Sequence, residues 1–295
     1  MEWEQTVGQK IGAFTFEQFH GKRNIGSTNI RVRNLMKYWP EYEMYKYGQK
    51  YDTLIFQKVY VTQSRQGLYQ FPVTYKGGLK ILDLCDPDWF QAPNMLKATV
   101  DGVDAITASS QGIVDFIKQL TDKPIVHIKD RFDLNDFPPK KEHKGKAKDI
   151  VWFGYAHNAE VLRGVVFHCL KRKLRLTVIA DSDPQIWQVT GDESFKEYYT
   201  FIKYDELAYQ KIQAHDICVL PKANRPQDKF KSDNKTTIAR LLGLPVATSP
   251  EDLDKFVDAK ARNEEVDKWY DKTRQEYNVE RSVEEYKQLI DKLGK

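Results

Sequence analysis

The sequence contains little cysteine and no long apolar run, and both absences narrow the class of protein. Three cysteines, Cys85, Cys169 and Cys218, stand far apart among its 295 residues, each in or beside an apolar stretch. This spacing is not typical of a disulfide framework or a metal site, so we expect three buried, reduced thiols. No run of about eighteen apolar residues occurs, so no membrane-spanning helix is expected.

Signals for export and for membrane attachment are also missing. The first residues, MEWEQTVGQK, lack the basic and then apolar segments of a signal peptide, so we expect a cytoplasmic protein. The sequence also lacks an amphipathic basic helix of the kind that attaches proteins to membrane surfaces. We expect no membrane span and a monomer.

Charge is unevenly distributed, although the net charge is only +4. Residues 1–148 contain 22 Lys and Arg against 17 Asp and Glu, a balance of +5, whereas residues 149–295 contain 24 against 25, a balance of −1. Two interpretations stay open. The excess is either ordinary solubility charge or an indication that the first half binds an anionic partner.

Residues 137–149, FPPKKEHKGKAKD, contain two prolines, a glycine and five lysines, which predicts an exposed interdomain linker. Short apolar strands alternate with helical segments on both sides of it. This alternation predicts an α/β protein with parallel sheets covered on both faces. We therefore predict two doubly wound, Rossmann-like domains facing a central cleft, an N-terminal domain over residues 1–143 and a C-terminal domain over residues 144–295.

The element predictions are specific enough to be compared with a structure. Strands are expected at 12–16, 53–57, 80–84, 104–109, 124–128, 149–155, 175–180, 199–204, 217–221 and 245–249. Helices are expected at 110–121, 158–173, 206–215 and 236–242. The last helix is expected to begin at a capping box of Ser282 and Glu285, and to be placed to pack back across the domain boundary.

Ligands of doubly wound domains bind beyond the carboxyl ends of the strands, so loops after strands are the candidate sites. The segment KSDNKTTIARLLGLPVATS, residues 231–249, predicts a polar loop, a short helix and a buried strand. Lysines at a helix start favour a bound phosphate, because lysine alone prefers the other helix end. The alternative is a solvated loop with an ordinary N-cap. The candidate phosphate-binding residues are Lys229, Lys231, Ser232, Asn234, Lys235 and Thr236.

A second candidate loop lies in WFGYAHNAEVL, residues 152–162, where a predicted strand runs into a glycine and then a helix. Glycine in the first strand–helix turn of a doubly wound domain permits close approach of a ligand phosphate. A simple tight turn is the alternative interpretation. The candidate residues are Gly154, Tyr155 and Asn158.

A third candidate loop ends KILDLCDPDWF, residues 80–90. Asp86 and Asp88 follow the predicted strand, where a carboxylate can act as a general base or bind a sugar hydroxyl. The alternative is turn formation by the DPD sequence. Asp83, inside the apolar run, is expected to be the least accessible of these carboxylates.

The fourth candidate loop is FHGKRNIGSTNIRVRNLMKYW, residues 19–39, in which a helix is expected to open at about Ser27. Its basic residues at the helix start again suggest an anion. The candidate residues are His20 as a proton shuttle, and Lys22, Arg23, Arg31 and Arg33 as acceptor-binding groups.

Six segments in chain order resemble glycosyltransferases of the GT-B fold, near the large retaining group that uses nucleotide-sugar donors. They are GSTNIRVRNLMKYWPE, YDTLIFQK, KILDLCDPDW, DIVWFGYAHNAEVL, HDICVLPK and KSDNKTTIARLLGLPVATSPED. The resemblance implies that the C-terminal domain binds the donor through the second and first candidate loops. It also implies that the N-terminal domain binds the acceptor and that transfer takes place in the cleft between the domains.

Glycosyl transfer from a nucleoside diphosphate leaves a diphosphate whose developing charge must be stabilised. DPD at 86–88 has the spacing of a metal-binding Asp-x-Asp pair, but it lies in the other half from the predicted diphosphate loop. We therefore expect a metal-independent enzyme without a cofactor, in which lysines and backbone N–H groups take the metal's part. The expected co-substrate is a UDP-sugar, the expected class is hexosyltransferase, and the expected setting is a bacterial or phage-infected host cytoplasm.

Bacteriophage DNA glycosyltransferases are small GT-B enzymes of similar organisation, and they modify hydroxymethylated pyrimidines in duplex DNA. The basic first half is compatible with such an acceptor, reached by base flipping. A glycan or a small molecule is the other candidate acceptor. Two alternatives to transfer also remain: a sugar-nucleotide epimerase or sugar-phosphate enzyme of the same build, and a non-catalytic module that binds nucleotide sugars or nucleic acid.

Overall fold

The computed structural model describes residues 9–22, 25–61, 74–90, 93–191, 193–223 and 225–294. Contacts divide the chain into two compact units. Unit 1 comprises Met1–Asp133, Arg225–Ser232 and Tyr277–Lys295, and unit 2 comprises Leu134–Asn224 and Asp233–Glu276. The chain therefore passes between the units four times. The sequence predicted the crossing after the first domain and the return of the C-terminal helix, but not the excursion of residues 225–232 into unit 1.

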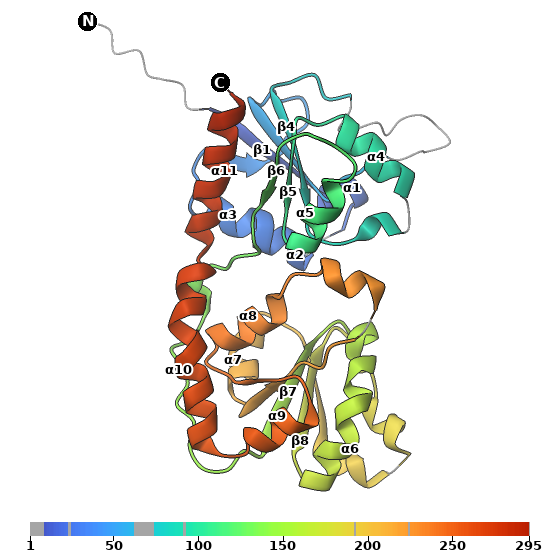
Figure 1. Ribbon diagram of the computed structural model, residues 1–295, viewed down its shortest axis with the longest axis vertical. Coiled ribbons are helices and arrows are strands. Elements are labelled where there is room, and N and C mark those ends of the chain that lie inside the picture. The colour runs from blue at the N-terminus through green and yellow to red at the C-terminus, as the bar shows by residue number, and fades with distance from the viewer. Residues whose placement is uncertain are drawn as a thin grey trace, which may run out of the picture. The chain divides into compact units, whose positions relative to one another are not determined.

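Unit 1 contains a six-stranded, fully parallel sheet of order β2-β1-β3-β4-β5-β6 (Figure 1). Successive side chains of a strand point to opposite faces, so each strand contributes to two hydrophobic cores. On β4, for example, Leu82 packs into one core and Ile81 into the other. The strands are β1 (Ile11–Thr15), β2 (Tyr42–Met44), β3 (Thr53–Gln57), β4 (Leu79–Leu84), β5 (Ala105–Ala108) and β6 (Ile125–His127).

Helices cover both faces of this sheet. Leu96 of α4 (Pro93–Asp101) and Ile113 of α5 (Gln111–Ile117) join the core that contains Leu82. The other core receives side chains from α11 (Val279–Leu293) and from the helical segment that it runs beside in Figure 1. That segment consists of α2 (Gly26–Thr28), the π-helical turn η1 (Asn29–Arg33) and α3 (Asn34–Met36). The shorter elements are α1 (Phe16–His20), η2 (Asp88–Phe90) and η7 (Pro226–Phe230).

Unit 2 contains a five-stranded parallel sheet of order β11-β10-β7-β8-β9. Its strands are β7 (Asp149–Gly154), β8 (Arg175–Ala180), β9 (Tyr199–Lys203), β10 (Ile217–Val219) and β11 (Val246–Ala247). Its α-helices are α6 (Arg163–Arg172), α7 (Ala208–Gln213), α8 (Asn234–Leu241), α9 (Pro250–Lys255) and α10 (Ala259–Glu276). Four short 3₁₀ helices complete the described part of unit 2: η3 (Leu134–Asp136), η4 (Ala156–Leu162), η5 (Ile186–Thr190) and η6 (Glu193–Tyr198).

The predicted fold class is confirmed: the protein is α/β, with two doubly wound domains built on parallel sheets. Every predicted strand is present, although several are shorter than expected. The prediction missed β2, an edge strand of only three residues. In unit 1 the strand order reverses between β1 and β3, and in unit 2 it reverses between β7 and β10. These reversals are where doubly wound sheets bind ligands.

The prediction of an exposed linker over residues 137–149 is only partly right: most of the segment is exposed, but it lies inside unit 2 and is anchored there by buried contacts. His143 is buried and lies 2.9 Å from the carbonyl oxygen of Gly243 through Nε2. The Lys141 ammonium donates to the carbonyl of His215 at 2.6 Å, and the buried guanidinium of Arg262 donates to the carbonyl of Gly145 at 2.9 Å. The lysine-rich composition suggested solvent exposure, but these backbone carbonyls are partners that composition does not reveal.

The predicted capping box at Ser282 is wrong. Helix α11 begins at Val279, and the side chain of Asn278 accepts from the N–H of Glu280 at 3.2 Å. Ser282 and Glu285 lie inside the helix, where both bind Arg131, the carboxylate at 2.6 and 2.7 Å. Helix α11 thus packs in unit 1 through a buried arginine.

The sequence predicted three buried, reduced cysteines and no membrane-spanning helix. The three cysteines are buried and form no disulfide, as predicted. No described helix combines the length and apolarity that crossing a bilayer requires.

Candidate functional site: two strand-end sites

The candidate site of unit 2 lies where its strand order reverses, after β7 and β10. Strand β7 ends at Gly154, and the chain after β10 leads to helix α8, which begins at Asn234. The N-cap residue Asp233 makes no side-chain hydrogen bond to the helix. The first N–H groups of a helix and its dipole together favour an anion at this end.

Gly154 and Lys235 form the centre of this site. Gly154 has a φ of 150°, and a Cβ atom there would clash with the Lys235 ammonium. That ammonium lies 4.4 Å from the centroid of the Trp152 ring, a cation–π distance. The absence of a side chain at Gly154 therefore lets a lysine of α8 place its charge at the end of β7.

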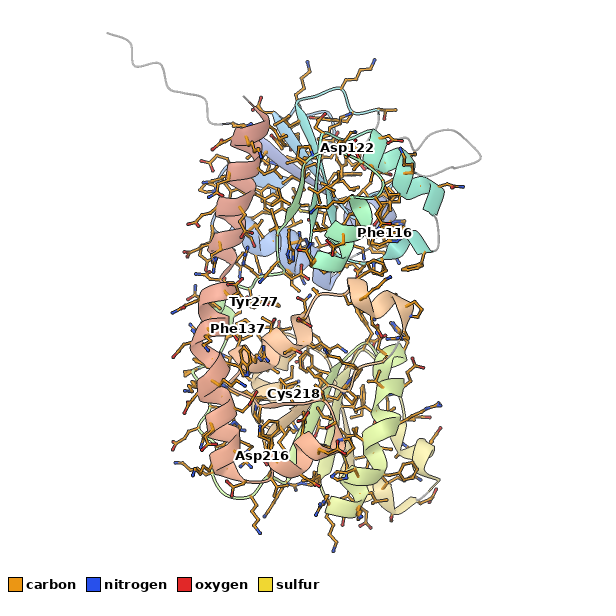
Figure 2. The ribbon with its side chains drawn as sticks, viewed as in Figure 1. Phe116, Asp122, Phe137, Asp216, Cys218 and Tyr277 are labelled. Atoms are coloured by element: carbon orange, nitrogen blue, oxygen red, sulfur yellow. The ribbon has the colours of Figure 1, made fainter. Side chains whose placement is uncertain are left out.

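The charge of Lys235 also affects Cys218, a buried residue of β10. Burial raises the pKa of its thiol, and the positive charge of Lys235 opposes that rise. Cys218, labelled in Figure 2, lies on β10, which pairs directly with β7; its register partner there is Val151, the residue before Trp152. The ammonium thus acts at the shared carboxyl edge of β7 and β10.

The turn after Gly154 adds aromatic and polar groups at this edge. Tyr155 is 52% exposed, and its ring stacks on that of His157 at 5.7 Å. The Asn158 amide nitrogen lies 3.0 Å from His157 Nε2. The N–H of Ala156 donates to Asp181, which follows β8 directly, at 2.7 Å. Asp181 was not among the predicted residues, although its position after an apolar strand was a usable signal.

Half of the predicted phosphate loop belongs to unit 1. Phe230 is buried there against Trp89 and Phe116, at ring distances of 5.4 and 5.7 Å, and Phe116 is labelled in Figure 2. Ser110 donates to the Phe230 carbonyl at 2.7 Å, and Ser232 donates to Asp130 at 2.7 Å. The sequence grouped Lys229, Lys231 and Ser232 with Asn234, Lys235 and Thr236, but the structure assigns only the last three to unit 2 with Gly154.

The two lysines of the unit 1 portion have local partners. Lys231 forms an ion pair with Asp228 at 3.2 Å. The Lys229 ammonium lies 4.9 Å from the centroid of the neighbouring Phe230 ring. Burial raises the pKa of Asp228, but its hydrogen bonds from Arg225 and Lys231 and their charges lower it below the ordinary value. The basic composition of this segment is therefore partly satisfied within η7.

The candidate site of unit 1 lies at the carboxyl ends of three neighbouring strands. Phe16 follows β1, Lys58 follows β3 and Asp86 follows β4 by two positions. The Lys58 ammonium donates to Asp86 Oδ2 at 2.6 Å and lies 5.3 Å from the centroid of the Phe16 ring. The predicted residue Asp86 thus follows the strand next to the strand-order reversal, and it is paired with a lysine that the sequence gave no reason to select.

Two further predicted residues contact the same Phe16 ring. The ring of His20, exposed at the end of α1, lies 4.2 Å from it at a tilt of 44°, and the Lys22 ammonium lies 5.4 Å from its centroid. Asp88 begins η2, and its side chain lies outside those that the structure describes. Arg23 lies outside the described residues altogether.

The prediction that Arg31 binds an acceptor is wrong. Its guanidinium is buried and donates to both carboxylate oxygens of Asp83, at 2.7 and 2.5 Å, and to Asp130 at 2.7 Å. Burial lowers the pKa of Arg31, but the two carboxylates outweigh that effect and raise it. Arg31 stabilises unit 1 from inside, while Asp83 is inaccessible, as expected.

Arg33, which was also predicted to bind the acceptor, forms an ion pair with Glu17. It is partly exposed and donates to Glu17 Oε2 at 2.5 Å. Burial raises the pKa of Glu17, but the hydrogen bonds from Arg33 and from the N–H of Ile25 lower it below its usual value. This pair connects the π-helical turn to α1, so Arg33 has a structural partner in place of an acceptor phosphate.

No family model and no curated protein matches the sequence. Among solved structures, the avilamycin A biosynthesis glycosyltransferase AviGT4 matches with a TM-score of 0.62 at 12% identity, covering 97% of this chain and 98% of that one. The DNA-modifying enzyme β-glucosyltransferase, solved with and without uridine diphosphoglucose, matches at 0.59 with 11% identity, covering 96% and 100%. S. aureus TarM, solved with UDP, matches at 0.59 with 10% identity, covering 81% of this chain and 55% of that one.

These similarities bear on the fold. The chain spans about half the length of TarM but nearly the whole length of the other two proteins. All three are glycosyltransferases, and the two parallel sheets of this chain match the GT-B architecture that the sequence predicted. The GT-B fold is thereby confirmed.

Proposed function

We propose that the protein is a glycosyltransferase that moves a hexose from a nucleoside diphosphate sugar, most simply a UDP-sugar, to an acceptor hydroxyl. One observation supports this most directly. The Lys235 ammonium is held at the glycine that ends β7, in the first turn of α8. Positive charge at a helix N-terminus suits a diphosphate, which is the group that leaves in such a transfer.

The proposed reaction requires two kinds of group. The acceptor oxygen forms a bond to the anomeric carbon while the bond from that carbon to the diphosphate breaks. Lys235 and the first N–H groups of α8 stabilise the departing diphosphate, and Asp86 accepts the proton of the acceptor hydroxyl. Neither role requires a metal or a cofactor, and we propose that the enzyme uses none.

We propose a hydroxymethylated pyrimidine in duplex DNA as the acceptor. The first half of the chain has a charge balance of +5, which favours an anionic partner. One structural neighbour is a DNA-modifying enzyme that uses uridine diphosphoglucose, which supports the same class of substrate. Exposed basic side chains of unit 1, among them Lys22, are available to contact phosphates.

The test is a transfer assay with radiolabelled UDP-glucose, offered with duplex DNA containing hydroxymethylated pyrimidine, with oligosaccharides, or with water alone. We expect labelled DNA and slow hydrolysis of the donor without acceptor. Release of an epimerised sugar nucleotide would instead favour the isomerase, and donor binding without any reaction would favour a non-catalytic module.

Salt dependence distinguishes the two acceptor classes. Binding to DNA releases counterions, so we expect transfer to DNA at low DNA concentration to fall steeply, by about tenfold or more, between 50 and 200 mM salt. The measurement is kcat/KM for the acceptor over that range. Activity that is indifferent to salt would count against DNA and favour a neutral glycan or small molecule.

The diphosphate assignment predicts matched effects at Gly154 and Lys235. Lys235→Met removes the charge, and Gly154→Ala inserts a Cβ atom where the ammonium lies. A charge-assisted hydrogen bond contributes about 1.5–3 kcal/mol, so each variant should weaken binding of UDP by roughly tenfold to a hundredfold. Calorimetric titration with UDP measures this, and Lys171→Met, on the exposed end of α6, is the control that should bind normally. Wild-type affinity in both test variants would remove the assignment.

A further inference from the structure

Lys58 has an unusual backbone conformation. Its φ of 54° lies in the left-handed region, which residues other than glycine adopt at a cost in energy. The N–H of Lys58 donates to the carbonyl of Asp83 at 3.0 Å, so this conformation is tied to the end of the neighbouring strand β4. Backbone strain of this kind tends to persist at functional sites, where the surrounding structure enforces it.

The side chain of Lys58 is directed by this turn toward a carboxylate that remains accessible. The Lys58 side chain is only 10% exposed, whereas that of Asp86 is 43% exposed. A buried ammonium normally requires compensation, and Asp86 Oδ2 at 2.6 Å and the face of Phe16 both supply it. The pair therefore consists of a fixed inner cation and an outer carboxylate.

The contacts of Asp86 are asymmetric. Both hydrogen bonds that it accepts from described residues go to Oδ2, from the Lys58 ammonium at 2.6 Å and from the Cys85 thiol at 3.8 Å. Burial raises the pKa of Cys85 well above its usual value, and the charge of Asp86 adds to this, so the thiol stays a neutral donor. Among the residues that the structure describes, this arrangement holds Oδ2, and the partly exposed carboxylate can turn Oδ1 to a group outside the protein.

The strand ends that support this pair are themselves fixed by buried polar contacts. Gln57, the last residue of β3, is fully buried. Its Oε1 accepts from Thr28 Oγ1 at 3.2 Å, and its Nε2 donates to Ser27 Oγ at 3.3 Å. A group that positions a reacting atom benefits from such support, because small displacements reduce rates strongly.

We propose that Lys58 is a positioning residue for the transfer reaction: by holding Oδ2 of Asp86, it orients Oδ1 toward the acceptor hydroxyl. The inference rests on the proposed function. In the reaction, Asp86 Oδ1 takes the acceptor proton as the new glycosidic bond forms and the diphosphate leaves. Lys58 stays protonated throughout and contacts neither the donor nor the acceptor.

The test is a double-mutant cycle of Lys58→Met and Asp86→Asn, with transfer of glucose from UDP-glucose to hydroxymethylated duplex DNA as the readout. Lys58→Met has similar size and no charge. We expect it to lower kcat by roughly tenfold or more while leaving the KM for UDP-glucose unchanged. In the Asp86→Asn background the same substitution should change kcat by less than about twofold, because Lys58 acts only through Asp86.

Two further variants separate positioning from structural support. Lys58→Arg retains the charge and should recover part of the lost kcat. Lys173→Met is the matched control, because Lys173 is another left-handed lysine, exposed at the end of α6, and it should keep wild-type kcat. Thermal melts of all variants should stay close to the wild type.

Each outcome decides the inference. Wild-type kcat in Lys58→Met, no recovery in Lys58→Arg, an equal loss in both backgrounds, or a loss that follows the melting temperature would overturn the positioning role while leaving the transferase intact. Absence of both transfer and donor hydrolysis in the wild type would overturn the proposed function, and the inference with it.

Discussion

Asp86→Asn is expected to reduce glycosyl transfer by roughly a hundredfold or more while donor binding stays normal. General base catalysis contributes about 10²–10⁴ to a rate, and an amide of the same shape cannot accept the proton. A hundredfold loss corresponds to about 2.7 kcal/mol of lost transition-state stabilisation. The measurement is single-turnover transfer from UDP-glucose, with a separate UDP titration to establish binding.

The matched control is Asp101→Asn, in the same unit. Asp101 is also a carboxylate paired with a lysine, Lys97, but it lies at the exposed end of α4 and should be dispensable for transfer. Asp86→Asn also removes the charged partner of Lys58, so a thermal melt is needed to show that the loss of transfer is not a loss of stability. Full activity in Asp86→Asn would remove the base assignment and make His20, whose ring contacts that of Phe16, the next candidate base.

The strands could be predicted because a parallel sheet covered on both faces leaves continuous apolar runs. TLIFQ was predicted as a strand over 53–57, and β3 spans Thr53–Gln57 with every residue buried. The same reasoning failed for YEM in β2, because a three-residue edge strand has too few apolar positions to be distinguished from a loop. The other edge strands, β6, β9 and β11, were predicted, because each lies in a longer apolar run.

The candidate sites were predictable in part, because strand ends are visible in sequence whereas charge pairing is not. Gly154 and Lys235 lie at the strand-order reversal of unit 2, and Asp86 follows the strand next to the reversal of unit 1; all three are in loops or helix starts after strands, as expected. Arg31 looked equally suitable, since a basic residue near a helix start resembles an anion site. Its partners Asp83 and Asp130 are far away in the sequence, so only the fold shows that its charge is already neutralised.

The same reasoning explains why the phosphate loop was predicted as one piece. The prediction rested on the basic residues between 222 and 235. The sequence alone does not show that Phe230, within the same stretch, is buried in a hydrophobic core of unit 1. The burial of Phe230 in that core accounts for the assignment of residues 225–232 to unit 1, despite the basic residues around it. Lys235, which comes after this anchor, is the cation that the structure assigns to unit 2.

The largest expected effect on stability follows from Arg31. Arg31→Met leaves Asp83 and Asp130 buried without their cation, and breaking a buried ion pair from one side costs about 3–5 kcal/mol. Tyr286 and Thr107 also bond to Asp83, at 2.9 and 2.7 Å, so the uncompensated charge would be embedded in the contact between α11 and the sheet. We expect the melting temperature of unit 1 to fall by on the order of 10 °C.

Lys97→Met tests whether the loss of stability expected for Arg31→Met arises because the Arg31 ion pairs are buried. Lys97 and Asp101 form an exposed pair on α4, and removing an exposed pair costs only about 0–1 kcal/mol. Differential scanning calorimetry of both variants should therefore show a large shift for Arg31→Met and almost none for Lys97→Met. Equal shifts for the two variants would contradict a buried ionic centre, and would make Arg31 available again as an acceptor-binding group.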